Sequence, residues 1–226
     1  MQLDLFTLLP LAAAIFVFWK LRSVLGSRDG AEPPAMPTDM GGDNVVTLPG
    51  AYREPEDVPA RDPEALKAII EKHAGKDKDL RDGLNAIAAR DPSFDPNEFL
   101  SGAKMAYEMI VTNFADGDKR ALKGLLAPDV YENFADAIDE RKARGESVRS
   151  TFVGIEKAVL SGAELVRDEE QVTVSFTSQI ISATLDKDDE VVDGDLQEVA
   201  EVTDVWTFSK PADSDDPNWK LVATDA

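Results

Sequence analysis

The chain has 226 residues, and its 24 Lys and Arg against 44 Asp and Glu give a formal net charge of −20, the wrong sign for binding a phosphate backbone. The sequence has no cysteine and one histidine, His73, so it lacks the side chains of a thiolate or histidine metal site, a disulfide framework or a thiol nucleophile. We therefore expect no cofactor, no metal and no nucleic-acid partner. A hydrophobic content of 43% is enough for a folded core.

The first 25 residues predict a transmembrane anchor. Residues 3–25 are long enough, as a helix, to cross a bilayer, and within them residues 5–19 form an apolar run that only Thr7 and Pro10 interrupt. Positive charge follows this run, whereas a signal peptide carries it in front. The positive-inside rule then places the N-terminus outside a bacterial inner membrane and the rest of the chain in the cytoplasm. A buried or amphipathic helix is the alternative. The anchor residues that we expect nearest the interface are Phe16, Phe18, Trp19, Lys20 and Arg22.

Residues 26–61 predict an acidic, flexible tether, because they contain five glycines and six prolines and show no hydrophobic period. Residues 62–92 predict two short helices that lead into the main domain. The first begins at Asp62 and Pro63, a capping residue and a first-turn proline, and ends at Gly75. The second begins near Asp77.

The main domain is predicted to occupy residues 93–226 and to begin with helices. The clearest helix starts at Asp95, which is followed by a proline and, three residues on, by a glutamate, and it stops at Gly117. A short helix then starts at Asp118. Another starts at Pro128 and ends at Gly145.

After these helices the hydrophobic period changes from 3.6 to 2, which predicts strands. Residues 148–167 indicate either two short strands or one bent strand, because Gly154 and Gly162 interrupt them. Further strands are predicted over residues 171–184, 198–209 and 218–224, with acidic turns at residues 186–190 and 193–195. The expected fold class is α+β: helices packed on a curved antiparallel sheet of about four strands, cone-shaped and like nuclear transport factor two.

Two stretches of the chain carry a family resemblance. These are YEMIVTNFADGDKRALKGLLAPDVYENFADAIDERKARGE at residues 107–146 and DVWTFSKPADSDDPNWKLVATDA at residues 204–226. The sequence resembles the bacterial branch of the Tim44-like domain family over roughly residues 93–226. The resemblance implies a cone-shaped domain with a large apolar pocket, association with the inner membrane, and an adaptor role without catalysis.

Two departures limit what this resemblance implies. The mitochondrial member recruits a heat-shock chaperone through a long segment ahead of the domain, and here that region is only a short tether, so chaperone recruitment is not expected. The mitochondrial member is also a peripheral protein that docks on anionic lipid through basic residues. Residues 31–226 of this chain contain 21 basic and 42 acidic residues, which argues against such docking.

Asp204 is the most unusual residue of the predicted sheet, because it shares the apolar face of its strand with Val202, Trp206 and Phe208. We expect it either to accept hydrogen bonds from its neighbours or to face outward at a bulge, and Ser178 is the polar candidate on the adjacent strand. The alternative is a general base in a pocket. The predicted pocket-lining residues are Tyr107, Phe114, Phe176, Val202, Asp204, Trp206 and Phe208.

Two functions follow from these observations. The favoured one is a membrane-anchored, non-catalytic binding or adaptor module whose apolar pocket takes an acyl chain or a peptide segment. Its partners would be a membrane protein complex or a translocating polypeptide. The alternative is a membrane-tethered isomerase or dehydratase that uses Asp204. A calcium site in the acidic residues 186–195 is less favoured than a solvated turn, because apolar residues occupy positions where ligands would be required.

Overall fold

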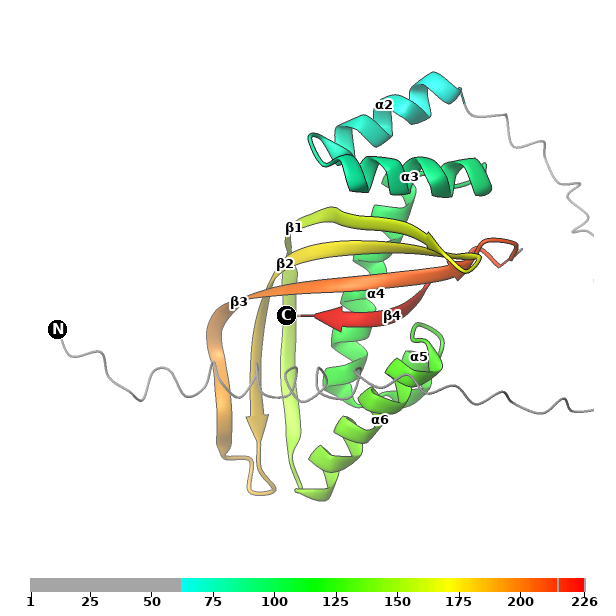
Figure 1. Cartoon of the computed structure of the whole chain (residues 1–226). Helices are drawn as coiled ribbons and strands as arrows, with labels where there is room; N and C mark the ends of the chain where they lie inside the picture. Colours follow the sequence, from blue (N-terminus) through cyan, green and yellow to red (C-terminus); the bar gives the residue numbers. More distant parts are fainter. Residues whose placement is uncertain (1–61, 215, 226) are drawn as a thin grey trace, which may run out of the picture.

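The computed structural model describes residues 62–214 and 216–225. The predicted anchor and tether lie outside the described residues. Within these described residues, five helices precede four strands (Figure 1). The elements are α2 (Pro63–Ala74), α3 (Lys78–Arg90), α4 (Pro96–Asp116), α5 (Lys119–Lys123), α6 (Pro128–Ala143), β1 (Ser147–Val166), β2 (Glu169–Leu185), β3 (Val191–Pro211) and β4 (Lys220–Asp225). Among the described helices, none is both long and apolar enough to cross a membrane.

The helices begin at the residues that the sequence predicts. A capping aspartate accepts backbone N–H groups at the start of each of the first four, which satisfies donors that the helix itself leaves free. These caps are Asp62, Asp77, Asp95 and Asp118. At the other end of α4, Gly117 adopts a left-handed φ of 70°, a conformation that favours glycine. The predicted boundaries of this helix are therefore confirmed.

The four strands form one antiparallel sheet in the order β1-β2-β3-β4. The open choice for residues 148–167 resolves as one bent strand, because β1 pairs with β2 along its length and its register shifts at Gly154 and Gly162. Such bulges bend a strand. In Figure 1, β1, β2 and β3 each bend, so that one half of the sheet lies beside α3 and the other half runs alongside α4 and α6. The predicted α+β class with a curved four-stranded sheet is confirmed.

The predicted turn at residues 193–195 is wrong. β3 already begins at Val191 and continues through this segment to Pro211. Opposite Ile181 of β2, residues 196–199 form a large bulge, and the side chain of Asp195 accepts the N–H groups of Gln197 and Glu198. Gly194 has a φ of 77°, and a Cβ there would lie 2.3 Å from the Ser182 carbonyl oxygen. Residues typical of a turn therefore shape a bulge within one long strand.

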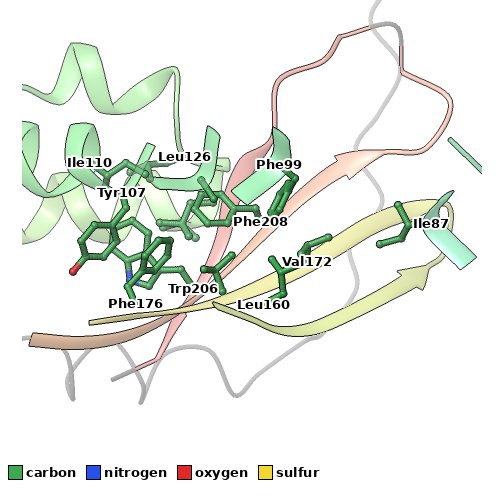
Figure 2. Close-up of a cluster of buried hydrophobic side chains, with 14 of the residues drawn as sticks. Ile87, Phe99, Tyr107, Ile110, Leu126, Leu160, Val172, Phe176, Trp206 and Phe208 are labelled. Atoms are coloured by element: carbon green, nitrogen blue, oxygen red, sulfur yellow. The ribbon is translucent and has the colours of Figure 1, made fainter. Parts of the chain in front are cut away.

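One hydrophobic core joins the helices to the sheet (Figure 2). Tyr107 of α4 lies against Phe176 of β2 and Trp206 of β3, and Phe99 of the same helix lies against Phe208 of β3. All five side chains are buried. At the far end of the sheet, α3 approaches β1 very closely. A Cβ on Gly83 would overlap the Ala163 carbonyl oxygen, so only glycine fits at this contact.

Candidate functional site

Asp204 lies inside the core, and its partners come from two other elements. The Tyr107 hydroxyl on α4 donates a 2.6 Å hydrogen bond to Oδ2 of Asp204 and lies 2.8 Å from the Ser178 hydroxyl on β2. All three side chains are buried, with Asp204 only 2% exposed. The prediction that Asp204 accepts a hydrogen bond from a neighbour is confirmed. Because that neighbour belongs to a helix, alternation along the strands alone did not reveal it.

In this trio of Tyr107, Ser178 and Asp204, one carboxyl oxygen of Asp204 lacks a hydrogen bond from the described part of the chain, and so does the indole nitrogen of Trp206 close by. Oδ1 of Asp204 and Nε1 of Trp206 are both buried and neither makes a hydrogen bond among the described residues. Burial raises the pKa of Asp204, although the Tyr107 hydroxyl and the nearby Trp206 indole favour its charged form and lower the pKa. Burial and the negative charge of Asp204 raise the pKa of Tyr107. In this conformation no substrate can reach the Asp204 carboxyl group.

The aromatic residues predicted to line a pocket are packed against each other. The Tyr107 ring centroid is 4.4 Å from that of Phe176 and 4.5 Å from that of Trp206, and Trp206 is 6.3 Å from Phe208. Phe114 is partly buried beneath Phe134, with centroids 5.0 Å apart, and Val202 on β3 is also partly buried. The space between Trp206, Phe208 and α4 is thus occupied by side chains, so these rings form core and are not the walls of an open pocket.

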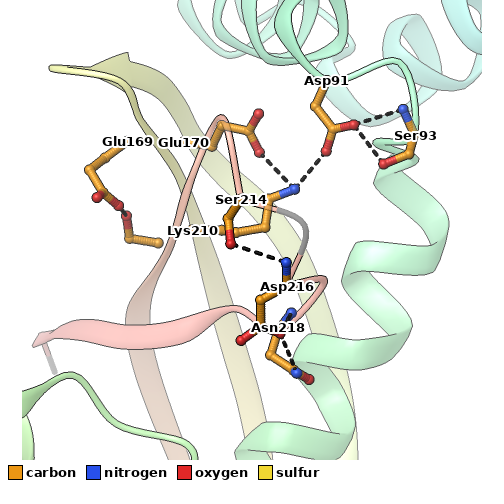
Figure 3. Close-up of polar contacts among 9 residues, drawn as sticks. Asp91, Ser93, Glu169, Glu170, Lys210, Ser214, Asp216 and Asn218 are labelled. Atoms are coloured by element: carbon orange, nitrogen blue, oxygen red, sulfur yellow. Dashed lines mark hydrogen bonds and ion pairs between the residues drawn. The ribbon is translucent and has the colours of Figure 1, made fainter. Parts of the chain in front are cut away.

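A second buried polar cluster links the α3–α4 connection to the sheet (Figure 3). Nζ of Lys210 donates a 2.6 Å hydrogen bond to Asp91 and lies 3.4 Å from a carboxyl oxygen of Glu170. Lys210 is 6% exposed and Glu170 is fully buried. Burial raises the pKa of Glu170, whereas the hydrogen bonds from Lys210 and Ser93 outweigh burial and lower that of Asp91. The ammonium group of Lys210 is therefore the counter-ion of both Asp91 and Glu170.

Sequence reasoning missed this cluster, although a signal for it was present. Glu170 shares the inward parity of Val172 and Val174, and Lys210 shares that of Phe208. The two residues are directly opposite in the register of β2 and β3. Extending the alternation by two residues would have placed an acid and a base face to face. The role of Asp91 depends on tertiary packing and had no such signal.

The hollows described on this structure lie elsewhere. One, of about 230 Å³, lies between α4 and β1 and is lined by Lys104, Met105, Glu108, Phe152, Val153, Gly154 and Ile155. The other, of about 300 Å³, lies where α5 meets α6 and is lined by Lys123, Leu126, Pro128, Tyr131 and Glu132. Neither contains a residue that the sequence analysis assigned to the pocket. These two surface hollows are therefore candidates for binding.

The acidic turn at residues 186–190 and His73 also make hydrogen bonds within the domain. Asp186 accepts the backbone N–H groups of Asp188 and Glu190, which is the geometry of a capped turn. Nε2 of His73 at the end of α2 lies 2.8 Å from the side-chain oxygen of Asn97 on α4. Within the described part of the chain, no group of three or more His, Cys, Asp or Glu could hold a metal ion. Phe16, Phe18, Trp19, Lys20 and Arg22 lie outside the described residues.

Among solved structures, the chain is similar to the crystal structure of the intermembrane space region of the chloroplast protein ARC6, with 11% identity and a TM-score of 0.39. That alignment covers 56% of this chain and 94% of the ARC6 chain. The search of curated proteins returned no match. The family model of the Tim44-like domain matches residues 80–226, which is well over half of the sequence, and the chain therefore belongs to the Tim44-like family.

Proposed function

We propose that the chain is a non-catalytic adaptor, anchored in the bacterial inner membrane by residues 1–25, that binds a protein partner through the outer surface of its cytoplasmic domain. The observation that carries this proposal is the Tim44-like match over residues 80–226, because membership in this family indicates a binding or adaptor role in membrane-associated processes. The partner would be a subunit of a membrane complex or a translocating polypeptide.

The packing of the core supports a role for the surface. Asp204 and Tyr107 are the residues best suited to chemistry, and both are buried and hydrogen-bonded to each other. An acyl chain could enter between Tyr107, Phe176 and Trp206 only if these contacting rings separated. Exposed aliphatic side chains are present instead on α4, β1 and β3. An adaptor that binds through such surfaces does not need an internal cavity.

The membrane part of the proposal is tested by topology and by deletion. In spheroplasts, external protease should leave residues 62–226 intact, and these residues should be digested only after lysis. The full chain should resist extraction from membranes by alkaline carbonate, and deleting residues 1–25 should make the domain extractable even where it is still held by a membrane partner. Digestion before lysis would overturn the cytoplasmic location, and a domain that resists carbonate extraction without residues 1–25 would overturn the anchor.

The adaptor part is tested by crosslinking in membranes. A photoreactive amino acid placed at the exposed Met105 of α4, at Val159 of β1 or at Val192 of β3 should crosslink the full chain to a discrete membrane-complex subunit or exported polypeptide. The matched control places it at Trp206, which is 1% exposed and should give no intermolecular product. An absence of products at all three exposed positions, in membranes that contain the full chain, would overturn the adaptor role.

A further inference from the structure

Among the described residues, the outer edge of β3 has no strand beside it over most of its length, because β4 pairs only with Val205 to Ser209. On the inner side, β2 pairs with β3 except at the bulge of residues 196–199, where the N–H groups of Gln197 and Glu198 bond to Asp195. Within residues 191–203, the described structure therefore leaves the outer backbone edge unpaired on either side of this bulge. In Figure 1 this half of β3 forms the border of the sheet on the side away from α4 and α6. Unpaired strand edges are templates for pairing with another chain.

This edge segment also exposes aliphatic side chains. Val191, Val192, Leu196 and Val199 are 43–54% exposed, and they account for four of the nine large apolar side chains that are exposed in the described part of the chain. Three of them are β-branched valines, which favour strand pairing. The segment is therefore suited to contact a second strand through both its backbone and its side chains.

The charge of the edge restricts what can pair with it. Residues 191–203 contain Asp193, Asp195, Glu198 and Glu201 and no Lys or Arg. Residues 62–226 as a whole contain 19 basic and 36 acidic residues. A second copy of the chain would bring acid against acid along the paired strands. A segment with Lys or Arg would neutralise the same acids.

We propose that residues 191–203 of β3 bind an extended segment of a partner protein, in which Lys or Arg alternate with aliphatic residues, by adding it to the sheet as a further strand. This inference rests on the proposed adaptor function and names the chemistry of the partner and the surface that it uses. Main-chain hydrogen bonds between β3 and the added strand would hold the segment in place, and the four acidic residues of the edge would favour a segment that contains Lys or Arg. The same acids keep two copies of the domain from pairing.

The test uses the full chain and defined peptides. The probe is a fluorescently labelled peptide with blocked termini that alternates lysine and valine. Its length of about ten residues is the upper end of the usual range for a strand. One control peptide replaces each lysine by glutamate. The other is N-methylated at every second residue, which removes backbone donors and leaves the charge unchanged. Affinity is measured by fluorescence anisotropy, and the site is located by amide hydrogen exchange.

Two double variants separate the edge from general electrostatic attraction. Glu198→Lys with Glu201→Lys reverses two exposed acids on the proposed edge, and Glu156→Lys with Glu164→Lys reverses two exposed acids on β1. Both change the net charge equally. The lysine–valine peptide should bind the native chain and slow exchange in residues 191–203. Its affinity should fall at least tenfold in the β3 variant and should stay within about threefold in the β1 variant.

The proposal would be overturned by an N-methylated peptide that binds equally well, by an equal loss in both variants, by slowed exchange that maps outside residues 191–203, or by a full chain that dimerises through this edge. Exchange in residues 191–203 that is already slow without peptide would assign the edge to another segment of the same chain and would also overturn it. If the peptide fails while crosslinks persist from Met105 or Val159 in membranes, the adaptor function stands and this surface assignment alone is wrong.

Discussion

Replacing Trp206 with alanine should destabilise the domain by about 3 kcal/mol. The side chain is 1% exposed and contacts the rings of Tyr107, Phe176 and Phe208. Removing a buried tryptophan ring costs about 3–5 kcal/mol through lost contacts and the cavity left behind. Its buried Nε1 makes no hydrogen bond of ordinary geometry with the described residues, so little hydrogen-bond energy is lost together with the ring. The net loss is therefore at the lower end of the range, still a large share of a stability of about 5–15 kcal/mol.

Urea denaturation of the full chain, followed by far-ultraviolet circular dichroism, measures this loss without depending on tryptophan fluorescence. Met105→Ala is the matched control, because Met105 is 61% exposed and its truncation should change the free energy of unfolding by no more than about 0.5 kcal/mol. A loss below about 1 kcal/mol for Trp206→Ala would refute the reasoning. That result would mean that the ring lines an open space in solution, as the sequence analysis expected.

Two further predictions concern the buried charges. Burial raises the pKa of Asp204 above its usual value of 3.8, so the native protein should lose stability as the pH rises from about 4 through the raised pKa. Asp204→Asn should remove this loss, so the urea midpoint of the variant should rise relative to that of the native protein as the pH increases. A difference in urea midpoint that does not change with pH would contradict this prediction. Lys210→Met should cost about 3 kcal/mol, because the buried Glu170 and the partly buried Asp91 lose their counter-ion. Lys78→Met, at an exposed ion pair, should change stability by less than about 1 kcal/mol. Adding Glu170→Gln to Lys210→Met should restore part of the loss, and a double variant as unstable as the single one would show that the charge of Glu170 is not the cause.

Local sequence signals determined the helix boundaries and the β-rich second half. Asp95 before Pro96 predicted the start of α4, and alternation through Val172, Val174 and Phe176 predicted β2 within a few residues. These features depend on caps, periods and turn chemistry that a window of a few residues contains. The same local reading failed at Gly194, because a left-handed glycine serves a hairpin turn and a strand bulge equally well, and only pairing with β2 distinguishes them.

The sequence by itself also determined the acidic charge and the absence of thiol and histidine-cluster chemistry, whereas the direction of Asp204 stayed open until the tertiary structure placed it inside the core. Whether the apolar face holds a pocket was decided by tertiary structure, because the answer depends on how far α4 brings Tyr107 toward Phe176 and Trp206. The partner of Asp204 was decided in the same way, since Tyr107 lies 97 residues earlier in the chain. Spacing along one strand specifies a direction for each side chain, but which groups meet depends on contacts between distant segments, and these form only when the whole domain packs.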